Sequence, residues 1–238
     1  KSALTLSRMV HFTLFGIPVY IRPSFWVVLA IFGGALSISS VEDLIYPALF
    51  VIAGFVAILS HEMGHALVGR KLGGGQQTIV LELFGGLTSS HGMQLTRGGR
   101  ALMILAGPMM TLLLGIISLG LTWNIVAPVM TSYNLNFWDL AISPFTAALI
   151  SPKLYILSCL IMIGEWWTIL NLLPIYPLDG GQLIAQYIRS PRKVFMTGFI
   201  TAILIGLLSF QLFHGYFIPI FMALFAYSNY REYKNAPF

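Results

Sequence analysis

Charge is what this sequence has least of. Only 9% of its 238 residues are Asp, Glu, Lys or Arg, whereas hydrophobic residues make up 57%. A soluble domain carries about 25% charged residues, so the composition excludes an ordinary soluble protein and predicts an integral membrane protein. Lys and Arg outnumber Asp and Glu by 13 to 8. They do not indicate a nucleic-acid partner, because they are scattered at the ends of apolar runs and form no basic patch.

Cysteine is almost absent as well, since Cys159 is the only one. A single cysteine excludes an internal disulfide and any zinc site built from several thiolates. Metal ligands within this chain must therefore be nitrogen or oxygen atoms. The sequence also lacks internal repeats and low-complexity tracts, so we expect a single transmembrane domain over residues 1–238.

The long apolar runs predict about six transmembrane helices, because a helix must cover a hydrocarbon core of about 30 Å. Pro174 and Pro177 interrupt the fourth helix, and a short helix is expected to start near Asp179. The predicted fold class is therefore all-α and polytopic, with a broken fourth helix. The six expected spans are 24–40, 45–70, 100–122, 152–173, 194–213 and 216–230.

Two shorter stretches predict membrane-associated β-structure. Residues 10–21 alternate in a way that favours a short strand or hairpin at the membrane surface. Residues 78–84 indicate a strand, followed by a bend at Gly85 and Gly86. This second stretch is too short to span the membrane as a helix, so we expect it at the cytoplasmic side, lying on the membrane or dipping into it. Its edge can add to an extended substrate, and the alternative is a hairpin that only holds two spans together.

The positive residues support the count of six spans. If Lys1 is cytoplasmic, both termini are cytoplasmic, and only Lys153 of the 13 Lys and Arg falls on the far side. Such an asymmetry is typical of membrane proteins, whose cytoplasmic loops carry an excess of Lys and Arg. We therefore expect a multi-pass protein of the cell membrane. The positive residues on the cytoplasmic side are 1, 8, 22, 70, 71, 97, 100, 189, 192, 193, 231 and 234.

The second predicted span carries the motif His61-Glu62-Met63-Gly64-His65. On an α-helix, His61 and His65 lie one turn apart on the same face, where their imidazole nitrogens can bind a zinc ion. Glu62 can then take a proton from water and pass it to a leaving amine. Arg70 ends the span, so the two histidines lie roughly 14 and 8 Å from it along the axis, inside the bilayer. The alternative is a pair of buried histidines satisfied by their neighbours.

A zinc site of this kind needs a third protein ligand. One soluble metalloprotease pattern is excluded, because its glycine and third histidine are replaced by Val68 and Lys71. Glu82 would suit another soluble class, but it lies on a predicted strand. Asp179 is the better candidate, because it can occupy a depth similar to that of His61 and the proline break lets it point inward. The alternative for Asp179 is an N-cap that precedes a glycine turn.

These residues resemble the site-two proteases, a family of intramembrane zinc metalloproteases. The resemblance rests on the His-Glu-x-x-His motif and on residues 171–181, Asn-Leu-Leu-Pro-Ile-Tyr-Pro-Leu-Asp-Gly-Gly. It implies that His61, His65 and Asp179 bind zinc (Zn²⁺) and that Glu62 activates water. It also implies that Asn171 helps to hold the substrate or stabilises the oxyanion.

Two further segments are similar to features of the family. They are the bend at Phe84-Gly85-Gly86 and the turn at Ala106-Gly107-Pro108. Family members often carry an asparagine three residues after that proline, where this chain has Thr111. No PDZ-like insertion and no nucleotide-binding CBS domain fits within the sequence, so the resemblance implies a minimal catalytic core.

The implied function is hydrolysis of peptide bonds within or near transmembrane segments of membrane-protein substrates, as in regulated intramembrane proteolysis. The expected partners are a transmembrane protein substrate, the lipid bilayer and, in some pathways, a regulatory membrane partner. Two alternatives stay open: a transporter or channel that binds a cation at the His/Glu/Asp site, and a non-catalytic scaffold with a structural zinc. The oligomeric state and the roles of Glu82, His91 and Glu165 stay open too.

Overall fold

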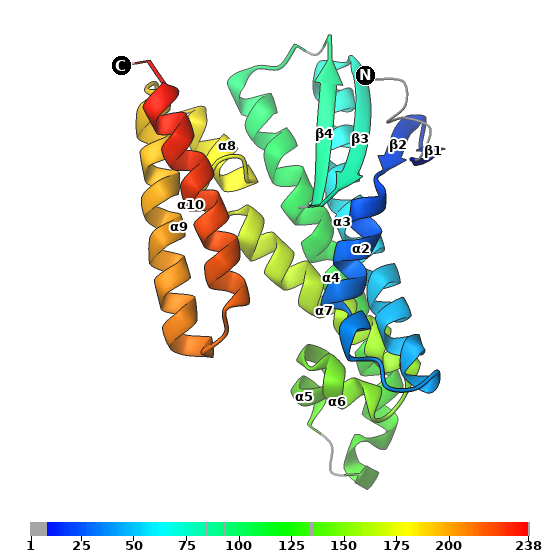
Figure 1. Cartoon of the computed structure of the whole chain (residues 1–238). Helices are drawn as coiled ribbons and strands as arrows, with labels where there is room; N and C mark the ends of the chain where they lie inside the picture. Colours follow the sequence, from blue (N-terminus) through cyan, green and yellow to red (C-terminus); the bar gives the residue numbers. More distant parts are fainter. Residues whose placement is uncertain (1–8, 84, 93, 134–135, 238) are drawn as a thin grey trace. The chain divides into compact units, whose positions relative to one another are not determined.

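The structure, a computed structural model, describes residues 9–83, 85–92, 94–133 and 136–237. The chain divides into two compact units, Lys1–Thr168 and Ile169–Phe238 (Figure 1). The first unit holds the β-strands and helices α2 to α6 with most of α7. The second holds the end of α7 and helices α8 to α10. Whether both units act as one protease domain stays a prediction.

Four helices in the described part of the chain are long and apolar enough to cross a membrane. They are α3 (Ile45–Gly73), α4 (Arg97–Tyr133), α7 (Pro152–Asn171) and α9 (Pro191–Phe213). They coincide with the predicted spans 45–70, 100–122, 152–173 and 194–213. The prediction of a multi-span helical membrane protein is therefore supported, while the count of six spans stays a prediction.

The first predicted span differs from the structure. Helix α2 (Pro23–Phe32) has ten residues, which at about 1.5 Å per residue is roughly half of a hydrocarbon core. The chain leaves the helix at Gly33, and Gly34 takes a left-handed conformation with φ of 87°. The prediction of a continuous helix over 24–40 is therefore wrong beyond Phe32. Two short 3₁₀ helices, η1 (Ala35–Ser37) and η2 (Glu42–Leu44), lead on to α3.

The sixth predicted span, 216–230, corresponds to α10 (Phe217–Asn235). This helix is long, but it is not among the four spans that length and composition support. The charged residues of its last turns, Arg231, Glu232 and Lys234, shorten its apolar stretch.

Residues 123–151 are rich in aromatic residues and proline, a composition that predicts an irregular interfacial loop. They are mostly helical instead. Helix α4 continues to Tyr133, and the short helices α5 (Phe137–Ile142) and α6 (Pro144–Ala148) follow. Each short helix starts at a side-chain cap: the side chains of Asn136 and Ser143 each accept a hydrogen bond from a backbone N–H of the first turn.

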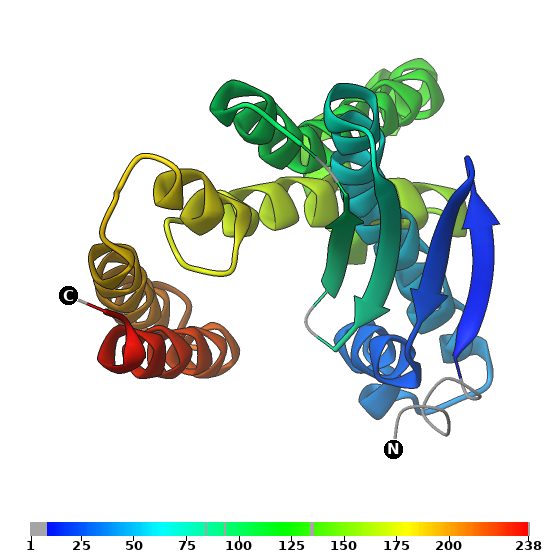
Figure 2. The same cartoon turned by 90° about the horizontal axis from the view of Figure 1, so that it is seen from above.

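Both predicted β-stretches form hairpins, and the two hairpins join into one four-stranded sheet (Figure 2). Strand β1 (Val10–Leu14) pairs antiparallel with β2 (Ile17–Ile21), and β3 (Gln76–Glu82) pairs antiparallel with β4 (Gly85–His91). The central pairing of β2 with β3 is parallel. The sequence pattern did not reveal it, because α2 and α3 separate these strands along the chain.

One face of the sheet packs against α2 and α3. The core has strand residues Ile17, Val19, Ile21, Ile79 and Leu81 packed with residues of α2 and α3. The guanidinium of Arg70, near the end of α3, donates to the carbonyl oxygen of Phe15 in the β1–β2 turn at 2.7 Å. The sheet is therefore fixed to the half of α3 that carries the histidine motif.

The second unit contains the predicted break. Helix α7 ends at Asn171, and the short helix α8 (Asp179–Ala185) begins after residues 172–178. The broken fourth helix is therefore confirmed. Helices α9 and α10 form a hairpin (Figure 1), with a core around Ile175, Ala202, Met222 and Ala226.

Candidate active site

His61 and His65 face each other on one side of α3. Their Nε2 atoms lie 3.1 Å apart, and their rings meet edge to face. Both side chains are buried, with exposed fractions of 2% and 8%. The Nδ1 of His65 donates to the carbonyl oxygen of Met103 at 2.8 Å. Because Nδ1 carries the proton, Nε2 keeps a lone pair that can bind a metal.

This pair fits the demands of a zinc ion. Two nitrogen ligands at about 2.0–2.1 Å from a tetrahedral zinc lie roughly 3.3 Å from each other. The observed separation of 3.1 Å between the two Nε2 atoms is close to that value. Burial among apolar residues also favours a function for two histidines and a carboxylate, since polar groups at membrane depth are costly.

Glycine lets helix α4 approach the histidines. A Cβ atom on Gly107 would overlap the His65 ring and would come within 2.8 Å of His61 Nε2. On α3, a Cβ on Gly64 would overlap the backbone carbonyl of Ala106. Small residues on both helices therefore allow α4 to lie close to α3. The chain does not turn there, however, because α4 stays helical through Pro108.

Thr111 supplies a polar group behind His61. Its hydroxyl oxygen lies 3.4 Å from His61 Nδ1 and 3.0 Å from the hydroxyl of Thr168. It also donates to the carbonyl oxygen of Pro108 at 3.0 Å. At the position where family members often carry an asparagine, Thr111 thus places a hydroxyl within reach of the His61 imidazole.

Glu62 lies against the inner face of β4. Its exposed fraction is 5%, and its carboxylate oxygen Oε2 accepts a hydrogen bond from the hydroxyl of Thr88 at 2.7 Å. The same hydroxyl is 3.1 Å from the Glu62 carbonyl oxygen. A Cβ on Gly86 would overlap the Glu62 side chain. Sequence reasoning missed Thr88, because its contact with Glu62 depends on how the sheet packs on α3.

The first residue of β4 packs on an aromatic side chain of α7. Gly85, with φ of 121°, leaves room for the ring of Trp167, which a Cβ would approach to 2.6 Å. The Trp167 ring in turn lies edge to face with His61, with centroids 6.5 Å apart. Gly85 and Gly86 are the first two residues of β4 and pair with Glu82 and Leu81 of β3, so the bend predicted at these two glycines is wrong. Phe84 lies outside the described residues.

In the second unit, Asn171 and Asp179 flank the break and both are buried. Asn171 ends α7, and Asp179 is the first residue of α8. The N-cap of α8 is Leu178, so the alternative interpretation of Asp179 as an N-cap is wrong. There is no room for a side chain at Gly180, because a Cβ there would overlap the carbonyl oxygens of Leu172 and Leu173.

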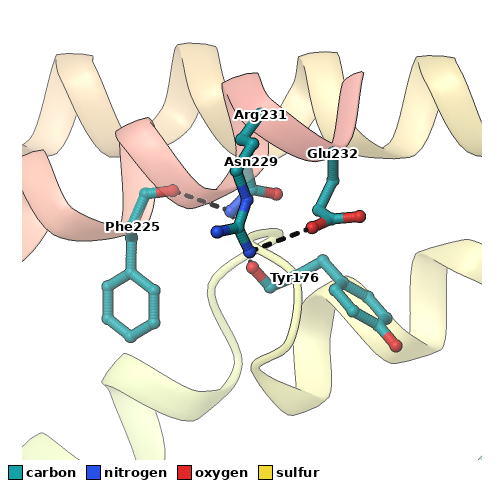
Figure 3. Close-up of polar contacts among 5 residues, drawn as sticks. All are labelled: Tyr176, Phe225, Asn229, Arg231 and Glu232. Atoms are coloured by element: carbon teal, nitrogen blue, oxygen red, sulfur yellow. Dashed lines mark hydrogen bonds and ion pairs between the residues drawn. The ribbon is translucent and has the colours of Figure 1, made fainter. Parts of the chain in front are cut away.

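Helix α10 holds the segment between Asn171 and Asp179. The side-chain amide of Asn229 donates to the carbonyl oxygen of Tyr176 at 2.6 Å and to that of Phe225 at 2.9 Å (Figure 3). Asn229 is buried. Gln182 adds a hydrogen bond to the Pro177 carbonyl oxygen at 2.9 Å. Sequence reasoning missed Asn229, because it lies in a different helix from the motif that it supports.

The sequence left the roles of three polar residues open, namely Glu82, His91 and Glu165. Glu82 forms an ion pair with Arg22 at 3.1 Å. His91 ends β4 and is exposed, and Glu165 is exposed on α7. The structure thus gives Glu82 a structural partner.

Fold and site together define a class: a helical membrane protein with a buried His-Glu-x-x-His helix next to a small sheet. The sequence profile of peptidase family M50 matches residues 49–213, so the chain belongs to peptidase family M50. The predicted site-two protease family and its zinc metalloprotease class are thereby confirmed at the level of the family.

Individual proteins agree with this assignment. Zinc metalloprotease MJ0392 of Methanocaldococcus jannaschii is 29% identical over 227 residues, which are 91% of this chain and 57% of that protein. The protein sll0528 of Synechocystis sp. is 28% identical over 188 residues, which are 74% of this chain and 43% of that protein. This chain therefore spans about half the length of these curated relatives.

A solved structure shares the fold. The site-2 protease from Methanocaldococcus jannaschii superposes with a TM-score of 0.60 at 24% sequence identity. The match covers 94% of this chain and 95% of that one.

Proposed function

We propose that this chain is a zinc metallopeptidase that hydrolyses peptide bonds within or near transmembrane segments of membrane proteins. One observation carries the proposal: His61, Glu62 and His65 are buried together on a helix of membrane-spanning length. Family membership and the names of the relatives support the same chemistry.

His61, His65 and Asp179 would hold the zinc ion. Together they offer two imidazole nitrogens and one carboxylate oxygen, one ligand atom from each residue. This donor set suits zinc, and three protein ligands leave a fourth position open, as in catalytic zinc sites. When bound, zinc would polarise the substrate carbonyl and make a nearby water more acidic.

Glu62 would act as the general base. It takes a proton from the attacking water and passes it to the nitrogen of the leaving amine, so that the proton removed in the first step is used in the second. Asn171 would donate its side-chain amide to the oxygen on which negative charge develops. Stabilisation of a charge that forms only in the transition state lowers the reaction barrier without tightening substrate binding.

Strand β4 offers a place for the substrate chain. In the part of the chain that the structure describes, it is the last strand in the order β1-β2-β3-β4, so one of its edges has no strand beside it there. A transmembrane substrate that has locally unwound can add to this edge through main-chain hydrogen bonds, which select an extended conformation and no particular sequence.

The substrate is proposed to be a membrane protein because the motif lies within an apolar helix. The distribution of the positive residues supports a multi-pass protein of the cell membrane with both termini in the cytoplasm, by the positive-inside rule. Regulated intramembrane proteolysis, with a regulatory membrane partner in some pathways, is the process to which this chemistry belongs by family resemblance.

The decisive variant is Glu62→Gln, in which the motif keeps both histidines. Zinc content of the purified protein and cleavage of a co-expressed membrane substrate are measured together. We expect zinc to be retained and cleavage to be lost. Unchanged cleavage would contradict the role of Glu62. Zinc flux in vesicles by the wild-type protein would favour a transporter, and bound zinc without any cleavage would favour a scaffold.

A further inference from the structure

Strand β4 presents two residues to the carboxylate of Glu62. Gly86 and Thr88 lie opposite Leu81 and Ile79 of β3, whose side chains are fully buried against α3. Since alternate residues of a strand face the same side, Gly86 and Thr88 share the face that contacts α3. Leu87, between them, is exposed.

The contact between Thr88 and Glu62 is short and directed. The hydroxyl donates to Oε2 at 2.7 Å, which is within the range expected of a hydrogen bond to an ionised oxygen. Threonine has a stiff side chain with few rotamers, so a hydroxyl on a paired strand is a well-fixed donor. The hydrogen bond therefore selects one orientation of the carboxylate.

Gly86 restricts the same side chain from another direction. A Cβ there would overlap Cγ and Cδ of Glu62 and would lie 2.6 Å from Oε1. The strand backbone thus lies directly against the carboxylate. Thr88 binds Oε2 and the Gly86 position lies against Cγ, Cδ and Oε1, so the strand restricts the carboxylate on two sides.

We propose that Thr88 is a positioning residue for the reaction: it fixes the carboxylate of Glu62 for proton transfer, so that β4 orders the general base as well as flanking it. This inference rests on the proposed function for the base role of Glu62. A general base contributes about 10²- to 10⁴-fold to a rate, and only when it is within reach of the proton. Loss of the Thr88 hydroxyl, which orients Glu62, therefore removes part of this contribution to the rate.

The test compares Thr88→Val, Thr88→Ser and Thr78→Val. Valine has the shape of threonine without the hydroxyl, whereas serine keeps the hydroxyl. Thr78 lies on the neighbouring strand β3, where it pairs with Ser89 on the opposite face of the sheet, so Thr78→Val is a matched control for the same change outside the strand proposed to bind the substrate. We expect T88V to lower kcat roughly ten- to a hundredfold, the usual effect of losing an orienting partner, with KM and zinc content unchanged. T88S and T78V should stay close to wild type.

A second readout does not depend on cleavage. The infrared bands of the Glu62 carboxylate are isolated by subtracting the spectrum of Glu62→Gln. We expect them to shift in T88V and to stay in place in T88S and T78V. Unshifted bands in T88V, a wild-type kcat in T88V, or an inactive T88S would each overturn the inference. Loss of zinc in T88V would overturn it too, because the effect would then come through the metal ligands. If the wild-type protein cleaves nothing, the proposed function fails, and the infrared comparison alone decides whether Thr88 holds Glu62.

Discussion

The two segments that carry the proposed zinc ligands are built in different ways. His61 and His65 lie four residues apart on the regular helix α3, so the helix itself sets their relative position. Asp179 follows an interrupted stretch, residues 172–178, whose backbone is held by a side chain from α10. The difference teaches that one part of a metal site can be specified locally while another depends on contacts between distant parts of the chain.

The largest effect is expected when one proposed zinc ligand is removed from either segment. His65→Ala and Asp179→Asn should each lower zinc affinity by more than about a hundredfold, because removal of a ligand costs more than removal of a ligand's partner. Cleavage should be lost with the metal. Zinc titration of the purified variants measures this.

The exposed His91 and Asp139 provide matched controls for these two changes. His91→Ala and Asp139→Asn should keep wild-type zinc affinity. If Asp179→Asn also keeps it, the third ligand is another group and the comparison between the two segments fails.

A slightly smaller effect is expected from a change that crowds the two histidines of α3. Gly107→Ala places a methyl group against both imidazoles, so the histidines must move apart or rotate. We expect weaker zinc binding and a loss of stability of about 1–3 kcal/mol from overpacking. Gly115→Ala on the same helix is the control, because a Cβ there meets nothing within 4 Å. Equal zinc binding by both variants would show that α4 does not limit the room around the histidines.

The broken segment should respond to a change far from it in sequence. Asn229→Leu removes the buried donor to the Tyr176 carbonyl oxygen, and the loss of such a hydrogen bond costs about 0.5–1.5 kcal/mol. We expect a lower thermal unfolding temperature and roughly tenfold weaker zinc binding. Calorimetry and zinc titration check this.

Asn124 provides the control for that change. It donates to the carbonyl oxygen of Gly120 on the same helix and is exposed, so Asn124→Leu should leave zinc affinity unchanged. A wild-type zinc affinity in Asn229→Leu would mean that the segment before Asp179 is fixed without help from α10.

The smallest effect is expected outside both segments. Glu82 pairs with Arg22 through partly exposed side chains, and such surface ion pairs contribute about 0–1 kcal/mol. Glu82→Gln should therefore change stability by less than about 1 kcal/mol and leave zinc content unchanged. Loss of zinc in this variant would make Glu82 a ligand and would reopen the soluble metalloprotease pattern that Asp179 replaces.

The same contrast explains what could be predicted from the sequence. The helix of His61 and His65 and the break at Pro174 were visible, because helical periodicity and proline act over a few residues. The early end of α2 at Gly33 was missed, because the apolar run continues past it. Thr88 and Asn229 could not be found, since their partners are brought to them by the parallel pairing of β2 with β3 and by the packing of α10. Neither of these leaves a local pattern.

Zinc K-edge X-ray absorption on the purified protein tests the central claim most directly, because it reports the atoms bound to the metal. We predict that nitrogen and oxygen atoms bind the metal at about 2.0–2.1 Å, with two imidazoles, one of which is lost in His65→Ala when that variant is loaded with zinc at a concentration above its weakened affinity. Absence of zinc from the wild-type protein, or an imidazole signal that His65→Ala leaves unchanged, would contradict the metal site proposed here.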